Sequence, residues 1–125
     1  MANDKKYALA PCSGMSPYGL ITRAACADSV KERDDLISIC MGATSADREG
    51  FRELIKKYPI MAVNGCEGYC VDKILKQKGV NVAKIINAQE ELDLENLKPT
   101  DTVRLDVEGE KCVLIIKEKI NKLIE

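Results

Sequence analysis

The distribution of hydrophobic residues along the chain predicts alternating strands and helices. Three short apolar runs, at 6–10, 36–40 and 60–63, are each followed by a glycine-containing turn and then by apolar residues at helical spacing. Short apolar runs are typical of buried parallel strands, whereas recurrence after three and four residues is typical of one face of a helix. The pattern therefore predicts a strand–helix unit that occurs three times.

Capping residues indicate where these helices begin and end. A serine–proline pair at 16–17 suits the start of a first helix that extends to about residue 31 or 33. Thr44 and Asp47 resemble a capping box at the start of the second helix. The third helix follows the turn after the third strand, and Gly79 is a suitable residue to end it.

The last third of the chain is less regular. Residues 82–87 are a candidate fourth strand, and residues 88–105 are polar, with a turn of helix expected near 90–97. Apolar residues then recur at helical spacing, which favours a terminal amphipathic helix from about Val107. A hairpin within residues 102–124 stays open as the alternative, because part of this stretch is rich in β-branched residues.

Together these elements predict the α/β class. We expect residues 1–125 to form a single three-layer domain, with a mainly parallel sheet of about four strands and helices on both faces. A chain of this length can bury a core without disulfides or metal. In open parallel sheets, ligand sites form beyond the carboxyl ends of the strands.

Four cysteines fall where such a site is expected. Cys12, Cys40 and Cys66 follow the first, second and third predicted strands, and Cys70 lies four residues after Cys66. The Cys66–Cys70 spacing alone is a weak signal, because zinc motifs more often have two intervening residues. The repeated position at strand ends carries more information, and we expect the four sulfurs at one edge of the sheet.

Composition narrows the classes of function. The formal net charge is −1 and the chain has one Phe and no Trp, so neither a basic surface nor aromatic stacking favours nucleic-acid binding. No apolar stretch reaches membrane-spanning length, and the first residues do not resemble an export signal. A cytoplasmic location is expected. There, clustered cysteines are metal ligands or redox thiols rather than a disulfide scaffold.

The chemistry of the cysteines leaves three interpretations. Histidine is absent, so a soft-metal site would be built from thiolates, and four thiolates suit zinc or an iron–sulfur cluster. Alternatively, the chain is a thiol redox enzyme or a sulfur carrier, with Cys66 activated at a helix start and Cys70 as its resolving partner. Papain-like catalysis is excluded because it needs a Cys–His pair. Whether the protein is an enzyme stays open.

The remaining candidate residues have simpler interpretations. Cys26 lies in a helix among alanines and Cys112 precedes an apolar run, so both are predicted to pack in the core. Glu67 is expected to be solvated at a helix start, while Tyr18 and Tyr69 are expected to pack at the core or rim.

The stretch Pro11-Cys12-Ser13-Gly14, Cys40 at the end of a strand, and Asn64-Gly65-Cys66 followed by Cys70 resemble the DGC-domain family. These are small prokaryotic proteins usually described as zinc-binding. The resemblance covers about residues 7–88 and extends only loosely over the last third.

The resemblance implies zinc as the favoured ion, with Cys12, Cys40, Cys66 and Cys70 as its ligands. The family is named for an Asp-Gly-Cys triplet, whereas Asn64 stands at the first position here. Asparagine preserves the tendency to turn but removes a carboxylate. Neither the sequence nor the resemblance identifies a protein partner. A homodimer formed through an edge strand or the tail stays open.

Overall fold

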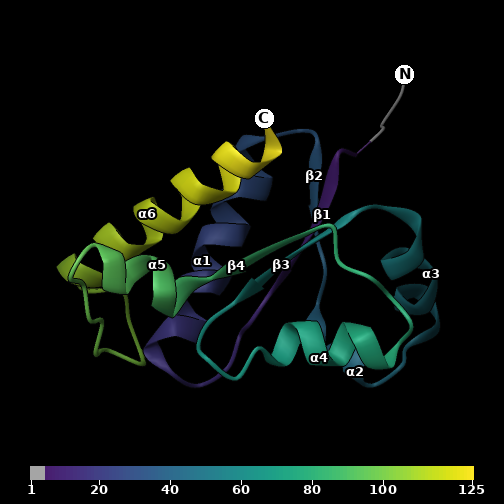
Figure 1. Cartoon of the computed structure of the whole chain (residues 1–125), viewed down its shortest axis with the longest axis horizontal. Coiled ribbons are helices and arrows are strands. Elements are labelled where there is room, and N and C mark those ends of the chain that lie inside the picture. The colour runs from purple at the N-terminus through teal and green to yellow at the C-terminus, as the bar shows by residue number, and fades with distance from the viewer. Residues whose placement is uncertain (1–4) are drawn as a thin grey trace.

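The computed structural model describes residues 5–125, which form four strands and six helices (Figure 1). In chain order these elements are β1 (Tyr7–Pro11), α1 (Pro17–Glu32), β2 (Leu36–Ser38), α2 (Met41–Ser45), α3 (Glu49–Lys57), β3 (Ile60–Asn64), α4 (Cys70–Gln77), β4 (Lys84–Asn87), α5 (Ala88–Leu94) and α6 (Val107–Ile124). The expectation about an export signal rests partly on residues 1–4, which lie outside the described residues.

The four strands form one parallel sheet in the order β2-β1-β3-β4. β1 lies between its two partners, with Leu9 opposite Ser38 of β2 and opposite Met61 of β3. β4 extends the sheet beyond β3, with Ile86 opposite Val63. The predicted α/β class and parallel sheet are confirmed.

Helices cover both faces of the sheet because side chains of a strand alternate between the faces. Met61 and Val63 of β3 point into a core built with α1, α5 and α6, which we call the α1–α6 core. Ile60 and Ala62 point into a core built with α2, α3 and α4, which we call the α3–α4 core. Figure 1 shows these two groups of helices on opposite sides of the strands.

Several predicted helix ends are confirmed. The side chain of Ser16 accepts the Gly19 N–H at 3.3 Å at the start of α1. Gly79, just after α4, has a φ of 78°, a conformation that glycine adopts without strain. The terminal helix is also confirmed, since α6 is continuous from Val107 and Asp106 caps it by accepting the Gly109 N–H at 2.8 Å.

The predicted capping box at Thr44 and Asp47 is wrong. Thr44 lies inside the short helix α2, where its hydroxyl donates to the carbonyl oxygen of Cys40 at 2.8 Å. Asp47 has a φ of 62° and lies in the turn before α3, whose first residue is Glu49. Two short helices therefore replace the single predicted one, because Asp47 adopts the left-handed conformation that interrupts a helix.

The polar connection after the fourth strand is more regular than expected. α5 starts directly at Ala88, and Asn87 caps it by accepting the Glu90 N–H at 3.0 Å. Within residues 5–125, no helix combines the length and the apolar character that crossing a membrane requires.

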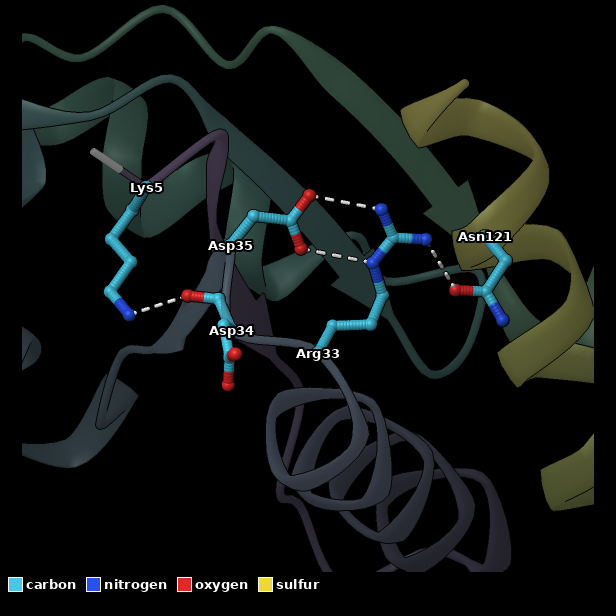
Figure 2. Close-up of polar contacts among 5 residues, drawn as sticks. All are labelled: Lys5, Arg33, Asp34, Asp35 and Asn121. Carbon is cyan, nitrogen blue, oxygen red and sulfur yellow. Dashed lines mark hydrogen bonds and ion pairs between the residues drawn. The ribbon is translucent and has the colours of Figure 1, made fainter. Parts of the chain in front are cut away.

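Polar contacts connect neighbouring elements at the amino end of the sheet (Figure 2). Arg33, just after α1, donates two hydrogen bonds of 2.9 Å to the Asp35 carboxylate and one of 3.2 Å to Asn121 of α6. Lys5 donates to the carbonyl oxygen of Asp34 at 2.6 Å. The hydrogen bonds and charge of Arg33 lower the pKa of the Asp35 carboxyl. Arg33 thus ties the end of α1 to both β2 and α6.

Candidate functional site

The four cysteines that follow strands all lie at the carboxyl edge of the sheet. Cys12 comes directly after β1, Cys40 precedes the first residue of α2, and Cys66 lies in the turn after β3. Cys70 is the first residue of α4. This edge is opposite to the polar contacts of Figure 2.

Two of these turns flank the topological switch point of the sheet. β1 and β3 are neighbours, but α1 packs into the α1–α6 core whereas α4 packs into the α3–α4 core. The connections after β1 and β3 therefore leave toward opposite faces, and such a position is where open parallel sheets commonly bind ligands. Cys12 and Cys66 lie at the two sides of that position.

Glycines bring three of the sulfurs close to one loop. A Cβ atom on Gly65 would lie 3.3 Å from the Cys12 Sγ. A Cβ atom on Gly68 would lie 3.5 Å from the Cys70 Sγ and 3.7 Å from the Cys66 Sγ. The 64–70 loop thus carries Cys66 and Cys70 and contacts the sulfur of Cys12 from the neighbouring strand.

Cys40 follows the edge strand β2, which neighbours β1 but not β3, so the sheet order separates it from Cys66 and Cys70. Its exposed sulfur accepts the Ala43 N–H at 3.4 Å and thereby caps α2. Across residues 5–125, no group of three or more cysteine, aspartate or glutamate side chains is placed to hold a metal ion. The structure therefore brings the four cysteines to one edge without assembling their sulfurs.

Asn64 shapes the loop from inside the protein. Its buried side-chain oxygen lies 3.2 Å from the Val71 N–H and 3.4 Å from the Asp72 N–H, which donate to it at the start of α4. Its amide nitrogen donates to the Asp72 Oδ1 at 3.0 Å and to the carbonyl oxygen of Ile86 at 3.4 Å. Asn64 thus caps the helix on which Cys70 lies, although five residues separate them.

Residues at the start of α5 form hydrogen bonds to the other side of the 64–70 loop. Asn87 donates to the carbonyl oxygen of Cys66 at 2.9 Å, and the Gln89 N–H donates to the carbonyl oxygen of Gly65 at 3.0 Å. The Gln89 side chain accepts the Glu67 N–H at 3.3 Å. We call these three contacts, with the Tyr69 contact described next, the α5 clamp.

Tyr69 occupies an unusual position just before α4. Its φ of 51° places it in the left-handed region, and its hydroxyl donates to the Glu90 carboxylate at 2.7 Å. Donation to that carboxylate raises the pKa of the Tyr69 phenol. The left-handed turn allows Cys66 and Cys70 to approach the same side of Gly68.

The turn that carries Cys12 is held by α1. The Thr22 hydroxyl, buried in α1, donates to the carbonyl oxygen of Cys12. Gly19 lets the 13–15 turn lie directly on the helix, because a Cβ atom there would overlap the Gly14 carbonyl oxygen. The backbone of the Cys12 turn and that of the 64–70 loop are therefore both fixed by contacts to helices.

Cys66 lies in a turn between a strand and a helix, so the condition for its activation at a helix start is not met. α4 begins at Cys70, and Cys66 lies in the preceding turn, where its carbonyl oxygen accepts the Tyr69 N–H at 3.3 Å. The helix-start environment therefore belongs to Cys70.

The side chain of Glu67 is exposed to solvent, as predicted.

The predictions for the other two cysteines are confirmed. Cys26 of α1 and Cys112 of α6 are both fully buried in the α1–α6 core. Burial raises the pKa of both thiols, since a thiolate would lose its hydration there. Tyr18 packs against the same core as expected.

Sequence reasoning missed the residues of the α5 clamp. Asn87, Gln89 and Glu90 contact the loop although at least 20 positions separate each of them from its partner. One signal was available: Asn87 followed three residues later by Glu90 is typical of a helix start. That signal locates α5 but says nothing about which loop its first residues hold.

Comparison with known families gives one match. Residues 8–118 match the model of the DGC domain family, which covers β1 to most of α6. Neither a curated protein nor a solved structure matches the chain.

Proposed function

The chain belongs to the DGC-domain family, and on this premise we propose that it binds a soft metal ion, zinc, through Cys12, Cys40, Cys66 and Cys70. The observation that carries the proposal is the position of three sulfurs around one loop: Cys12 at Gly65, and Cys66 and Cys70 at Gly68.

The donor set suits this ion. All four residues are free cysteines at least partly accessible to solvent, and the chain has no histidine to compete with them. Four thiolates hold zinc tetrahedrally and leave no open position, which favours a structural, storage or delivery role over activation of water. The donor chemistry fits zinc, and binding would require the four sulfurs to approach one another.

Formation of the site requires Cys40 to approach the 64–70 loop. α2, which Cys40 caps, has only five residues, so little regular structure resists its displacement. Because metal binding is coupled to folding, binding energy can draw ligand segments together. We infer that zinc binding draws all four sulfurs together, with Cys40 moving toward the 64–70 loop.

The test is elemental analysis of protein purified without oxygen and without a metal-affinity tag, with a free-thiol count on the same sample. We expect about one zinc per chain and four thiols protected until a chelator is added. Serine at each of the four positions should weaken zinc binding at least about tenfold. Cys26→Ala is the matched control, because its thiol lies in the core and should leave zinc content unchanged. Metal-free protein with six unprotected thiols would overturn the proposal.

A second candidate function rests on Cys66 and Cys70 alone. Their sulfurs share the space beside Gly68, which suits a dithiol that exchanges with an external disulfide. This redox or sulfur-carrier interpretation needs one thiol far more than the other three, whereas zinc binding needs all four. An alkylation series with one dominant fast thiol would favour it. An iron–sulfur cluster, the third interpretation, would colour the protein.

We also infer a cytoplasmic location for the protein. All six cysteines are free, and thiols persist in a reducing compartment.

A further inference from the structure

A pocket of about 310 Å³ opens beside Cys40, between the carboxyl ends of β1 and β2. Its walls come from both sides of the sheet, with Arg23 of α1 at one side and Phe51 of α3 at the other. The volume is at the lower end of the range for small-molecule sites. Its place beyond parallel strand ends is where open sheets bind ligands.

The charge of the lining selects the kind of ligand. Arg23 is the only charged residue that lines the pocket, and none of the lining residues is acidic. In the part of the chain described here, Arg23 takes part in no ion pair. Its guanidinium is always protonated and matches a carboxylate with two parallel hydrogen bonds. Ser13 and Ser38 add uncharged polar residues to the same lining.

The rest of the lining is apolar. Ile39 and Met41 are buried, and together with Phe51 they give the pocket a hydrophobic wall. An aromatic ring and a thioether favour contact with a flat or unsaturated group. A ligand that pairs with Arg23 would therefore place an apolar body over this wall, while the Cys40 thiol lies at the same pocket.

We propose that this pocket binds a small molecule with one carboxylate and a flat apolar body, the carboxylate pairing with Arg23 and the body lying against Phe51 and Met41. The site is distinct from the zinc site in its chemistry, because it uses a cation and an apolar wall. The two sites share Cys40, so a ligand bound in the pocket would occupy a space that one of the proposed metal ligands lines.

The test is a titration of the full-length protein with phenylacetate, followed by the amide chemical shifts of the whole chain in nuclear magnetic resonance. We expect saturable shifts at Ala27, Ile39 and Met41, which line the pocket. Phenylacetamide, which has the same shape without the charge, should bind about tenfold more weakly. Arg23→Gln should weaken phenylacetate binding by about the same factor and leave phenylacetamide unaffected.

Arg104→Gln is the matched control, since Arg104 is exposed and does not line the pocket. It should leave the titration unchanged. Equal binding of the acid and the amide, no effect of Arg23→Gln, or no saturable shift at the pocket amides up to about 10 mM would each overturn the proposal. Because the readout is amide shifts rather than thiol reactivity or metal content, it stays separate from the test of zinc binding.

Discussion

Asn64 shows how much one buried side chain decides at this edge. Its oxygen accepts two backbone N–H groups of α4, while its nitrogen donates to Asp72 and to the carbonyl oxygen of Ile86. The Asn64 amide supplies both an acceptor and donors at this position, whereas an ionised carboxylate would supply acceptors alone. An aspartate at this position, which the resemblance to the DGC-domain family implies, would accept hydrogen bonds but could not donate while ionised.

Asn64→Asp should therefore destabilise the protein. The new carboxylate would face the Asp72 carboxylate and the Ile86 carbonyl oxygen, which leaves two acceptors without a donor. We expect a loss of about 1 to 3 kcal/mol in the free energy of unfolding at pH 7, measured by urea denaturation. Burial and the nearby negative charge should raise the folded-state pKa of the introduced carboxyl, so its penalty should shrink as pH falls toward about 4.

The exchange variant Asn64→Asp with Asp72→Asn is the matched control. It reverses donor and acceptor across the same 3.0 Å contact and should recover most of the lost stability. If the single variant is as stable as the parent protein at pH 7, the Asn64 amide does not have this role.

Gly19 lies where the backbone of the 13–15 turn leaves no space for a side chain. A Cβ atom at this position would be 2.2 Å from the carbonyl oxygen and 2.7 Å from the nitrogen of Gly14, so Gly19→Ala must displace the 13–15 turn. We expect a loss of about 1 to 3 kcal/mol in thermal or urea unfolding. Gly50→Ala is the control, because a Cβ atom on Gly50 of α3 would meet nothing within 4 Å. It should be neutral or stabilising by up to about 1 kcal/mol. Equal effects of the two substitutions would contradict the packing argument.

At the scale of elements, the α5 clamp joins two turns that are far apart in sequence. Asn87 both caps α5 and holds the carbonyl oxygen of Cys66. Asn87→Ala removes both contacts and should lower the free energy of unfolding by about 1 to 2 kcal/mol. It should also speed amide hydrogen exchange at Gln89 and Tyr69, whose N–H groups donate to Gly65 and Cys66.

Asn87→Ser separates the two contacts. Serine retains an oxygen that caps a helix but is too short to replace the amide that reaches Cys66. We expect stability close to that of the parent protein, with exchange at Tyr69 still faster. Unchanged exchange at Tyr69 and Gln89 in both variants would show that the clamp does not hold the loop.

The elements differ in how far the sequence predicted them. The strands and the helices α1, α3, α4 and α6 were predictable because burial leaves apolar residues at fixed spacing. α2 was missed because Thr44 looks like a capping residue, although its hydroxyl bonds back to Cys40. The α5 clamp was missed because side chains that hold a distant backbone look in sequence like ordinary loop residues.

At the scale of the whole molecule, the two ends of the sheet differ. The carboxyl edge carries thiols on turns, whereas the amino edge is fastened by Arg33 and Asp35, which are 31% and 33% exposed. The sequence predicted that four cysteines would meet at one edge, since parallel strands end there together. It did not indicate that Cys40 would lie apart from Cys66 and Cys70, because the hydrophobic pattern of the strands does not specify the order β2-β1-β3.

Asp35→Asn tests the amino edge. Arg33 lowers the folded-state pKa of Asp35, so this ion pair stabilises the fold above the ordinary carboxyl pKa, and the contribution is lost as pH falls through the lowered value. We expect the variant to be less stable by up to about 1 kcal/mol at pH 7, with solvent and salt screening the effect. The difference should vanish in acid. Measurement is urea unfolding at several pH values, and a difference that grows toward low pH would contradict this assignment.

The burial of Cys26 and Cys112 has a consequence for kinetics in solution. A thiol reagent meets two populations in this protein: four cysteines at the edge, and two that are sealed between α1 and α6. Labelling of the sealed pair requires the two helices to separate, because in the closed state both thiols are buried and burial raises their pKa. The slow labelling rate of Cys26 and Cys112 therefore measures how often these two helices separate in the native protein without denaturant.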